Sequence, residues 1–351
     1  MFKILFIIVL FPVLAFSSRK KVLLYDVYKE AARTNIGNRS QINPISLYFN
    51  AAFDTIQNPT YFTQKDIWKN HDVVWQRVKD PFKGIRDGGG LKKLLSDEFF
   101  GKRAAPNYTL HLIGGGHDFR LLYEYYQENG YSFPFAFSFV TQYLGHFANE
   151  AVEASNKTFI GAHDHIADLY FFDLAGIFLF MNDNVTTYFR DKMFLELWTF
   201  QPMFDGEHIQ NAALNYVVRP YRDDHKISFF SFNGMQTLLG ASLKTKKGFY
   251  SFGVGPAYID PLNNIAKLAV GLFYDVDNNL MSSLFFNTTD NYKVRLNLHP
   301  GSMSFARDFG LFSAYRDNKD FLIGINYKLP VGIVGLLKWI NQQQLFSVEC
   351  V

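Results

Sequence analysis

The stretch Tyr292–His299 reads Y-K-V-R-L-N-L-H, and its pattern decides the predicted fold. Every second side chain is apolar: Tyr292, Val294, Leu296 and Leu298. The side chains between them are charged or polar: Lys293, Arg295, Asn297 and His299. Because a β-strand sends successive side chains to opposite faces, the stretch predicts a strand with one apolar and one polar face.

The same alternation recurs in three other segments of the second half: Phe249–Tyr258, Lys267–Tyr274 and Phe321–Lys328. In each segment, aromatic and aliphatic side chains occupy one face, and small or polar side chains occupy the other. This is typical of transmembrane β-barrels, whose strands alternate between lipid and the barrel interior. A soluble antiparallel sheet also alternates, so a secreted β-sandwich that acts as a binding protein is an alternative.

The composition fits the same class of protein. Aromatic residues make up 18% of the 351 residues. The mean hydropathy of −0.06 excludes a protein with many membrane-spanning helices, but it suits a barrel, in which half of each strand is polar. The net charge of +3 is too small to indicate a nucleic-acid partner.

The N-terminus predicts export. Residues Met1–Ser17 are typical of a secretory signal peptide, with Lys3, an apolar run at Ile4–Leu14 and a small-x-small cleavage site at 15–17. The single cysteine, Cys350, excludes an internal disulfide, which exported eukaryotic domains of this size often carry. We therefore predict the Gram-negative outer membrane as the location and its lipid as the partner. The sequence indicates no particular protein partner.

Four regions follow one another along the chain: a signal peptide (1–17), a mixed region (18–105), a helical segment (106–182) and a β-barrel (183–351). Short turns such as Asn233-Gly234 predict an antiparallel up-and-down meander. Ten strands are expected: Phe194–Gln201, Gln210–Arg219, Lys226–Phe232, Met235–Lys244, Phe249–Tyr258, Ala266–Asp275, Leu280–Phe286, Tyr292–His299, Ser304–Tyr315 and Lys319–Leu329. With Ser46–Phe53 and Pro330–Trp339 as further candidates, we predict a transmembrane barrel of about ten to twelve strands.

The α-helical insertion contains three predicted helices: Phe119–Gln127, Pro134–Glu153 and Ile166–Met181. A further helix is predicted upstream, at Gln64–Val78. None reaches the uninterrupted apolar length of a membrane span. The fold class is therefore β with an α-helical insertion, in which the helices plug or flank the barrel.

The candidate site lies in this helical segment. His146, Glu150 and Glu153 share one narrow stripe of their predicted helix, because residues three to four apart lie on the same helix face. His111 and Asp168 stand upstream and downstream of that stripe. Such groups are costly to bury unless they are paired or bound to a metal. We take these five residues as candidate catalytic residues.

Three interpretations of this cluster remain open. The groups pair with one another and lock a helical plug, which gives the protein a structural or transport-related role. Alternatively, a histidine and a carboxylate act as acid and base in a hydrolase or acyltransferase that modifies membrane lipid. The third interpretation is metal binding, since histidine and carboxylate ligands suit zinc or iron. The sequence identifies no particular cofactor.

Short motifs within this region are also informative: N-Y-x-x-H at 107–111, E-Y-Y-x-x-N-G at 124–130, G-H-F-x-N-E-x-x-E at 145–153 and I-A-D-L-Y-F-F-D at 166–173. Together with the strands that follow, this layout resembles an uncharacterised bacterial family of outer-membrane β-barrels that carry an inserted helical segment. The resemblance covers about residues 106–339. It implies location and architecture, but it brings no established activity.

Overall fold

The computed structural model describes residues 19–52, 67–101, 104–153, 162–204, 209–210, 213–260, 265–288, 292–303, 307–316, 320–327 and 332–337. The predicted signal peptide, Met1–Ser17, lies outside the described residues. The chain forms two compact units. One unit comprises residues 1–26 and 65–188 and is helical; the other comprises 27–64 and 189–351 and contains the β-sheet.

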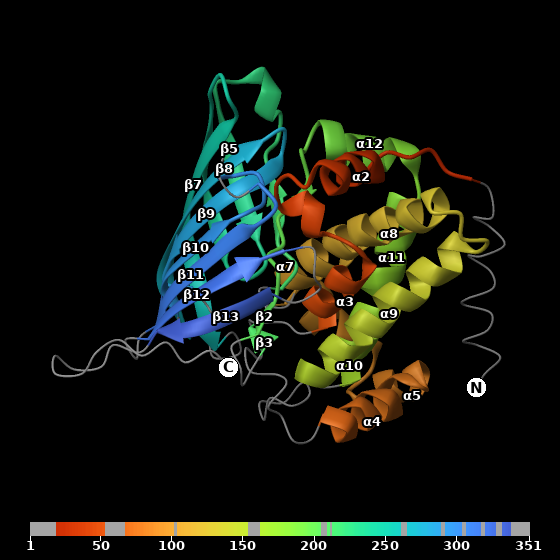
Figure 1. The fold of residues 1–351 in the computed structure, drawn as a ribbon. Helices are drawn as coiled ribbons and strands as arrows, with labels where there is room; N and C mark the ends of the chain where they lie inside the picture. The colour runs from red at the N-terminus through yellow and green to blue at the C-terminus, as the bar shows by residue number, and fades with distance from the viewer. Residues whose placement is uncertain are drawn as a thin grey trace. The chain divides into compact units, whose positions relative to one another are not determined.

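The second unit is built on one sheet of thirteen strands. Their bounds are β1 (Glu196–Leu197), β2 (Met203–Phe204), β3 (Ile209–Gln210), β4 (Tyr216–Val218), β5 (Ile227–Asn233), β6 (Thr237–Lys244), β7 (Phe249–Asp260), β8 (Ile265–Val276), β9 (Asn279–Phe286), β10 (Tyr292–Leu298), β11 (Gly310–Arg316), β12 (Phe321–Asn326) and β13 (Gly332–Leu337). The strands from β4 to β13 follow chain order and are antiparallel, which confirms the predicted meander. The sheet curls (Figure 1), and with its helices it gives a mixed α/β fold.

The prediction of a strand at Ser46–Phe53 is wrong. Residues 46–52 lie in helix α3 (Pro44–Ala52), which follows α2 (Tyr25–Thr34) and η1 (Asn38–Gln41), and Phe53 lies outside the described residues. The Oδ1 atom of Asn43 accepts hydrogen bonds from the backbone N–H groups of Ile45 (3.0 Å) and Ser46 (3.1 Å). Such a cap, followed by a proline in the first turn, begins a helix whatever the alternation downstream.

Two other predicted strands are shorter than expected. Phe194–Gln201 contributes only β1 to the start of the sheet, and Gln210–Arg219 contributes β4 and the end of β3. Phe194 has φ 48° and Ala213 has φ 57°. A residue in the left-handed region cannot continue an extended ladder, so β1 begins only after Phe194 and β4 only after Ala213.

The long strands have a buried inner face and an exposed outer face. On β7, the outer residues Tyr250, Phe252 and Val254 are 56%, 47% and 39% exposed, whereas Ser251 on the inner face is 3% exposed. Strands β8 and β12 alternate in the same way, with Leu272 and other apolar side chains facing outward. The alternation predicted from the sequence is therefore confirmed for these strands.

Tyr292 is an exception to the predicted pattern. It is fully buried, while Val294 and Leu296 on the same strand are partly exposed. The register between β10 and β11 shifts between Tyr292 and Val294. Because an irregularity of this kind changes the face on which later residues lie, Tyr292 shares the inner face with Arg295 and not the apolar outer face.

Cross-strand pairing extends the outer face into three rows that run from β5 to β12. The central row comprises Phe229, Ala241, Phe252, Leu272, Leu284, Leu296, Ser313 and Ile323. The flanking rows comprise Ile227, Leu243, Tyr250, Tyr274, Ser282, Leu298, Leu311 and Ile325, and Ser231, Leu239, Val254, Val270, Phe286, Val294, Tyr315 and Phe321. None of these side chains is charged. We call these three rows the apolar band.

The inner face holds an aromatic core together with a buried ion pair. Its buried members are Trp198, Phe200, Val217, Phe230, Phe232, Met235, Leu238, Ala257, Ala269, Phe273, Leu280 and Phe285. The guanidinium of Arg219 donates to both carboxylate oxygens of Asp275 at 2.7 and 2.9 Å, and it lies over the Trp198 ring. The core therefore lies on the opposite side of the sheet from the apolar band.

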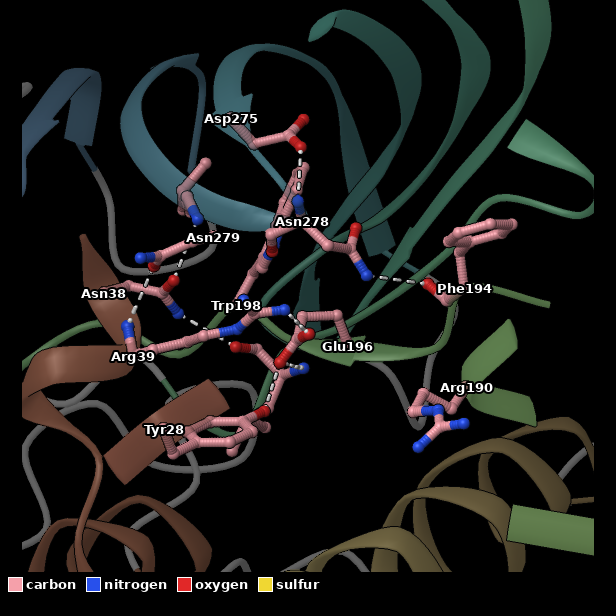
Figure 2. Close-up of polar contacts among 12 residues, drawn as sticks. Tyr28, Asn38, Arg39, Arg190, Phe194, Glu196, Trp198, Asp275, Asn278 and Asn279 are labelled. Carbon is pink, nitrogen blue, oxygen red and sulfur yellow. Dashed lines mark hydrogen bonds and ion pairs between the residues drawn. The ribbon is translucent and has the colours of Figure 1, made fainter. Parts of the chain in front are cut away.

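Polar contacts attach the N-terminal part of this unit to the turn between β8 and β9 (Figure 2). The amide of Asn38 donates to the Leu197 carbonyl at 2.8 Å, and its Oδ1 accepts from the Leu280 N–H at 3.0 Å. Arg39 forms a buried ion pair with Glu196. These contacts attach η1 to the sheet through buried hydrogen bonds and a buried ion pair.

The helical unit contains the predicted helices. The elements from residue 67 onward are α4 (Ile67–Val78), α5 (Pro81–Asp87), α6 (Leu91–Leu94), η3 (Leu95–Phe99), α7 (Ala104–Pro106), η4 (Asn107–Gly115), α8 (Gly116–Glu128), α9 (Pro134–Glu153), α10 (Ala162–Ile166), η5 (Ala167–Phe172), α11 (Asp173–Phe180) and α12 (Asp183–Asp191). The predicted helix Pro134–Glu153 is α9. Among the helices that the structure describes, none is long and apolar enough to cross a membrane.

The close approach of α11 to η4 depends on Gly176. A Cβ added at Gly176 would lie 2.5 Å from the Leu112 carbonyl oxygen and 3.1 Å from the Gly116 nitrogen. Because both atoms are backbone, we expect Gly176→Ala to destabilise the protein by about 1–3 kcal/mol. Urea unfolding followed by circular dichroism measures the change. The control is Ala175→Ser on the exposed side of α11; equal unfolding midpoints for the two variants would contradict this packing.

Candidate functional site

The structure brings four of the five candidate residues together inside the helical unit. His146 and Glu150 come from α9, His111 from η4 and Asp168 from η5. Ligand-type atoms of His111, Glu150 and Asp168 lie within 4.8 Å of one another, and His111 is equally close to His146 and Asp173. The fifth candidate, Glu153, is the last residue of α9, and its side chain lies outside the described residues.

Two π-helical segments position this cluster. Both η4 and η5 are π-helices, and each contributes one side chain to the cluster: η4 contributes His111 and η5 contributes Asp168. A π-helical turn inserts an extra residue into a helix and therefore redirects the side chains around it. At Gly115, an added Cβ would lie 3.3 Å from His146 Cε1 and 3.4 Å from Asp173 Oδ1, so the glycine leaves room for the cluster.

Asp173 is the shared partner of two histidines. Its Oδ1 lies 3.1 Å from His111 Nδ1, and its Oδ2 lies 2.7 Å from His146 Nδ1. Burial disfavours ionisation of Asp173, but the charge of His146 and the hydrogen bonds from both imidazoles outweigh burial and lower its pKa to about 2. Burial also opposes the charge on His111, yet Asp168 and Asp173 raise the pKa of His111 well above its usual range.

Glu150 stands at the other end of the cluster. Its Oε2 accepts a hydrogen bond from His165 Nδ1, and Arg77 Nη1 lies 2.8 Å from His165 Nε2. Glu150 is fully buried, and burial together with the charge of Asp164 raises its pKa to about 8. Burial and neighbouring carboxylates likewise raise the pKa of Asp168, although His111 opposes this shift.

Several buried polar atoms in the cluster have no hydrogen-bond partner among the described residues: Gln142 Oε1, Gln142 Nε2, Glu150 Oε1 and Asp168 Oδ1. Gln142 is 6% exposed, and its Nε2 would lie 3.1 Å from a Cβ placed on Gly115, next to His146 and Asp173. Unpaired buried polar atoms are rare in native proteins, because each one costs a desolvation penalty. Four of them in one cluster indicate a place for a further polar group or ion.

The sequence-based list of candidate residues omitted important neighbours. Asp173, which bonds both histidines, and His165 lie in the motif-rich stretch downstream of α9. Gln142 precedes His146 by four residues, so helical spacing alone places it on the same face. Arg77 lies in α4, far away in sequence, and no local pattern indicates its role.

The other histidines of the segment have separate roles. His117 is buried on α8 and pairs with Asp118 at 3.0 Å, and His163 bonds the Ile85 carbonyl at 3.1 Å.

No protein-family model, curated protein or solved structure matches this chain. The fold and the site define a mixed α/β protein with an apolar band on its sheet and a buried histidine–carboxylate cluster.

Proposed function

We propose that this chain is a bacterial outer-membrane protein whose sheet is the wall of a β-barrel and whose apolar band contacts lipid. The observation that carries the proposal is the absence of charge in the three outer rows. A soluble protein seldom exposes so large a contiguous apolar surface, because it would drive association. In a barrel the same surface is required, since a lysine or arginine at the bilayer midplane costs about 2–4 kcal/mol.

The segment from Glu196 to Phe204 supports closure of the wall. Its first end, β1, pairs with β4, and its second end, β2, pairs with β13. Between them, the amide of Gln201 makes hydrogen bonds of 2.9 and 3.1 Å with the backbone of Tyr327. One short segment thus pairs, over two residues at each of its ends, with both ends of the meander.

Aromatic side chains at one end of the band also support a membrane. Tyr250 and Tyr274 stack with ring centroids 4.8 Å apart, and the Tyr274 hydroxyl donates to the Lys247 carbonyl at 3.1 Å. Lys247 belongs to the turn between β6 and β7. Tyrosines at strand ends form the interfacial girdle of outer-membrane barrels, because the ring suits lipid and the hydroxyl suits water.

Cell fractionation tests the proposal. The full-length protein is expected in the outer-membrane fraction, resistant to extraction by alkaline carbonate. Unheated samples are expected to migrate differently from boiled ones on a denaturing gel, because barrels resist unfolding by detergent. Recovery as a soluble periplasmic protein contradicts the proposal, and a soluble oligomer indicates that a second copy covers the band instead of lipid.

A second candidate function, modification of a membrane lipid, is favoured by the geometry of Asp173. This carboxylate lies 2.7 Å from His146 Nδ1 and so fixes the orientation of the ring. A carboxylate that orients a histidine in this way prepares its other nitrogen to act as a base. The base would take a proton from water while the water oxygen bonds to an acyl carbon, and would return the proton to the departing alcohol.

Lipid mass profiles test this second function. Cells that carry wild-type protein are expected to differ from cells without it, and His146→Ala and Glu150→Gln are expected to remove the difference without loss of folded protein. His71→Ala, a histidine of α4 outside the cluster, serves as the matched control. Identical profiles in all strains would leave the cluster without this activity.

A further inference from the structure

We propose that His111, Glu150 and Asp168 bind one divalent transition-metal ion in the helical unit. The ligand atoms of these three residues lie within 4.8 Å of one another. Ligands that bind one zinc ion at about 2.0–2.2 Å lie within about 4.4 Å of one another, so only a small contraction is needed. The site goes beyond the proposed location in the outer membrane and does not depend on it.

The unpartnered atoms point to a cation at this place. Glu150 and Asp168 are 0% and 4% exposed, and each has a carboxylate oxygen without a partner among the described residues. Two buried carboxylates next to each other repel one another unless a proton or a cation lies between them. A divalent ion would bind both oxygens and neutralise both charges. It would therefore remove the two main costs of burying these carboxylates, which are the unpaired oxygen atoms and the uncompensated charge.

Asp173 prepares His111 to be a ligand. Its Oδ1 lies 3.1 Å from His111 Nδ1, so when a metal ion displaces the proton from Nε2, Nδ1 keeps its hydrogen bond to Asp173 and Nε2 becomes the ligand. Nε2 lies 3.7 Å from Asp168 Oδ2, on the side of the proposed ion. A carboxylate that bonds the far nitrogen of a ligating histidine is a common second partner in metal sites, where it fixes the ring and raises its basicity.

Two neighbouring sets of three possible ligands are less suitable for binding a metal ion. Around Glu150, Asp164 and His165, the Arg77 guanidinium lies 2.8 Å from His165 Nε2, and this positive charge repels a cation. Around His111, His146 and Asp173, both carboxylate oxygens of Asp173 already accept hydrogen bonds from the imidazoles. The mixed nitrogen and oxygen donors of the remaining group suit Zn²⁺, Fe²⁺ or Mn²⁺ better than Ca²⁺ or Mg²⁺.

Calorimetry with ZnCl₂ tests the site on the full chain, purified in detergent and stripped with a chelator. The wild type is expected to bind one Zn²⁺ per chain. Glu150→Gln and Asp168→Asn are expected to weaken binding by at least about 100-fold, and Asp173→Asn by about 10–100-fold through the orientation of His111. His71→Asn, outside the cluster, is expected to bind as the wild type does.

X-ray absorption spectroscopy of the zinc-loaded wild type is a second test of the site, and it does not require any variant to fold. The expected spectrum contains oxygen and histidine nitrogen ligands and no sulfur. Sulfur in the first shell would place the ion at the single cysteine, Cys350, and would overturn the proposal. A folded wild type that binds no Zn²⁺ would overturn it as well. So would loss of binding in His146→Gln with unchanged binding in Glu150→Gln, because that result places the ion between His146 and Asp173.

Discussion

Replacement of Leu272 by arginine is expected to destabilise the protein in a lipid bilayer by about 2–4 kcal/mol. Leu272 is 41% exposed in the central row of the apolar band, where it pairs with Phe252 and Leu284 on the neighbouring strands. In water, a charge at a partly exposed position costs little. In lipid the guanidinium loses its hydration, and the free energy of unfolding falls. Urea unfolding of the protein in vesicles, followed by tryptophan fluorescence, measures this change.

Leu91→Arg is the matched control for this experiment. Leu91 is a leucine of the helical unit that is 54% exposed, so it resembles Leu272 in residue type and in accessibility. Its substitution is expected to change the free energy of unfolding by no more than about 0.5 kcal/mol. If both variants are as stable as the wild type in vesicles, the apolar band does not lie in lipid.

Replacement of Asp173 by leucine is expected to cost about 3–5 kcal/mol. Asp173 is 1% exposed and is the hydrogen-bond partner of both His111 and His146. Leucine has a similar volume but no acceptor, so two buried imidazoles lose their shared hydrogen-bond partner. Thermal unfolding of the full chain, followed by the helical signal in circular dichroism, measures the loss.

Asp87→Leu separates this effect from the general loss of an aspartate. Asp87 forms an exposed ion pair with Lys83 on α5. Exposed pairs of this type contribute about 0–1 kcal/mol, so the control variant is expected to unfold close to the wild type. Equal melting temperatures for Asp173→Leu and Asp87→Leu would mean that Asp173 does not hold the cluster together.

The sheet was predictable because its strands depend on a local pattern. The alternation in Phe249–Tyr258 and Lys267–Tyr274 has the period of a strand, and the short turns between strands determine an antiparallel neighbour. The face of Tyr292 was not predictable, because it depends on a register shift against β11 that the strand's own sequence does not indicate. The stretch Ser46–Phe53 was predicted as a strand, although Asn43 and the proline that follows it are typical of a helix start.

The candidate site was predictable only in part. Helical spacing alone places His146 and Glu150 on one face of α9, and their polar character in an apolar segment marks them as unusual. The contribution of Asp173 depends on the packing of α11 against η4, and that of Arg77 depends on the position of α4. Contacts between elements far apart in sequence arise only in the folded chain, so a single sequence gives no local signal for them.

Spin labelling tests contact of the apolar band with lipid most directly. The chain has a single cysteine, so Cys350→Ser removes it and Leu272→Cys or Leu91→Cys then gives one labelling site. In vesicles, a nitroxide at residue 272 is expected to collide readily with oxygen, which concentrates in lipid, and rarely with a polar nickel chelate. The label at residue 91 is expected to show the opposite preference. Ready collision of the nickel chelate with the label at residue 272 would contradict the membrane account.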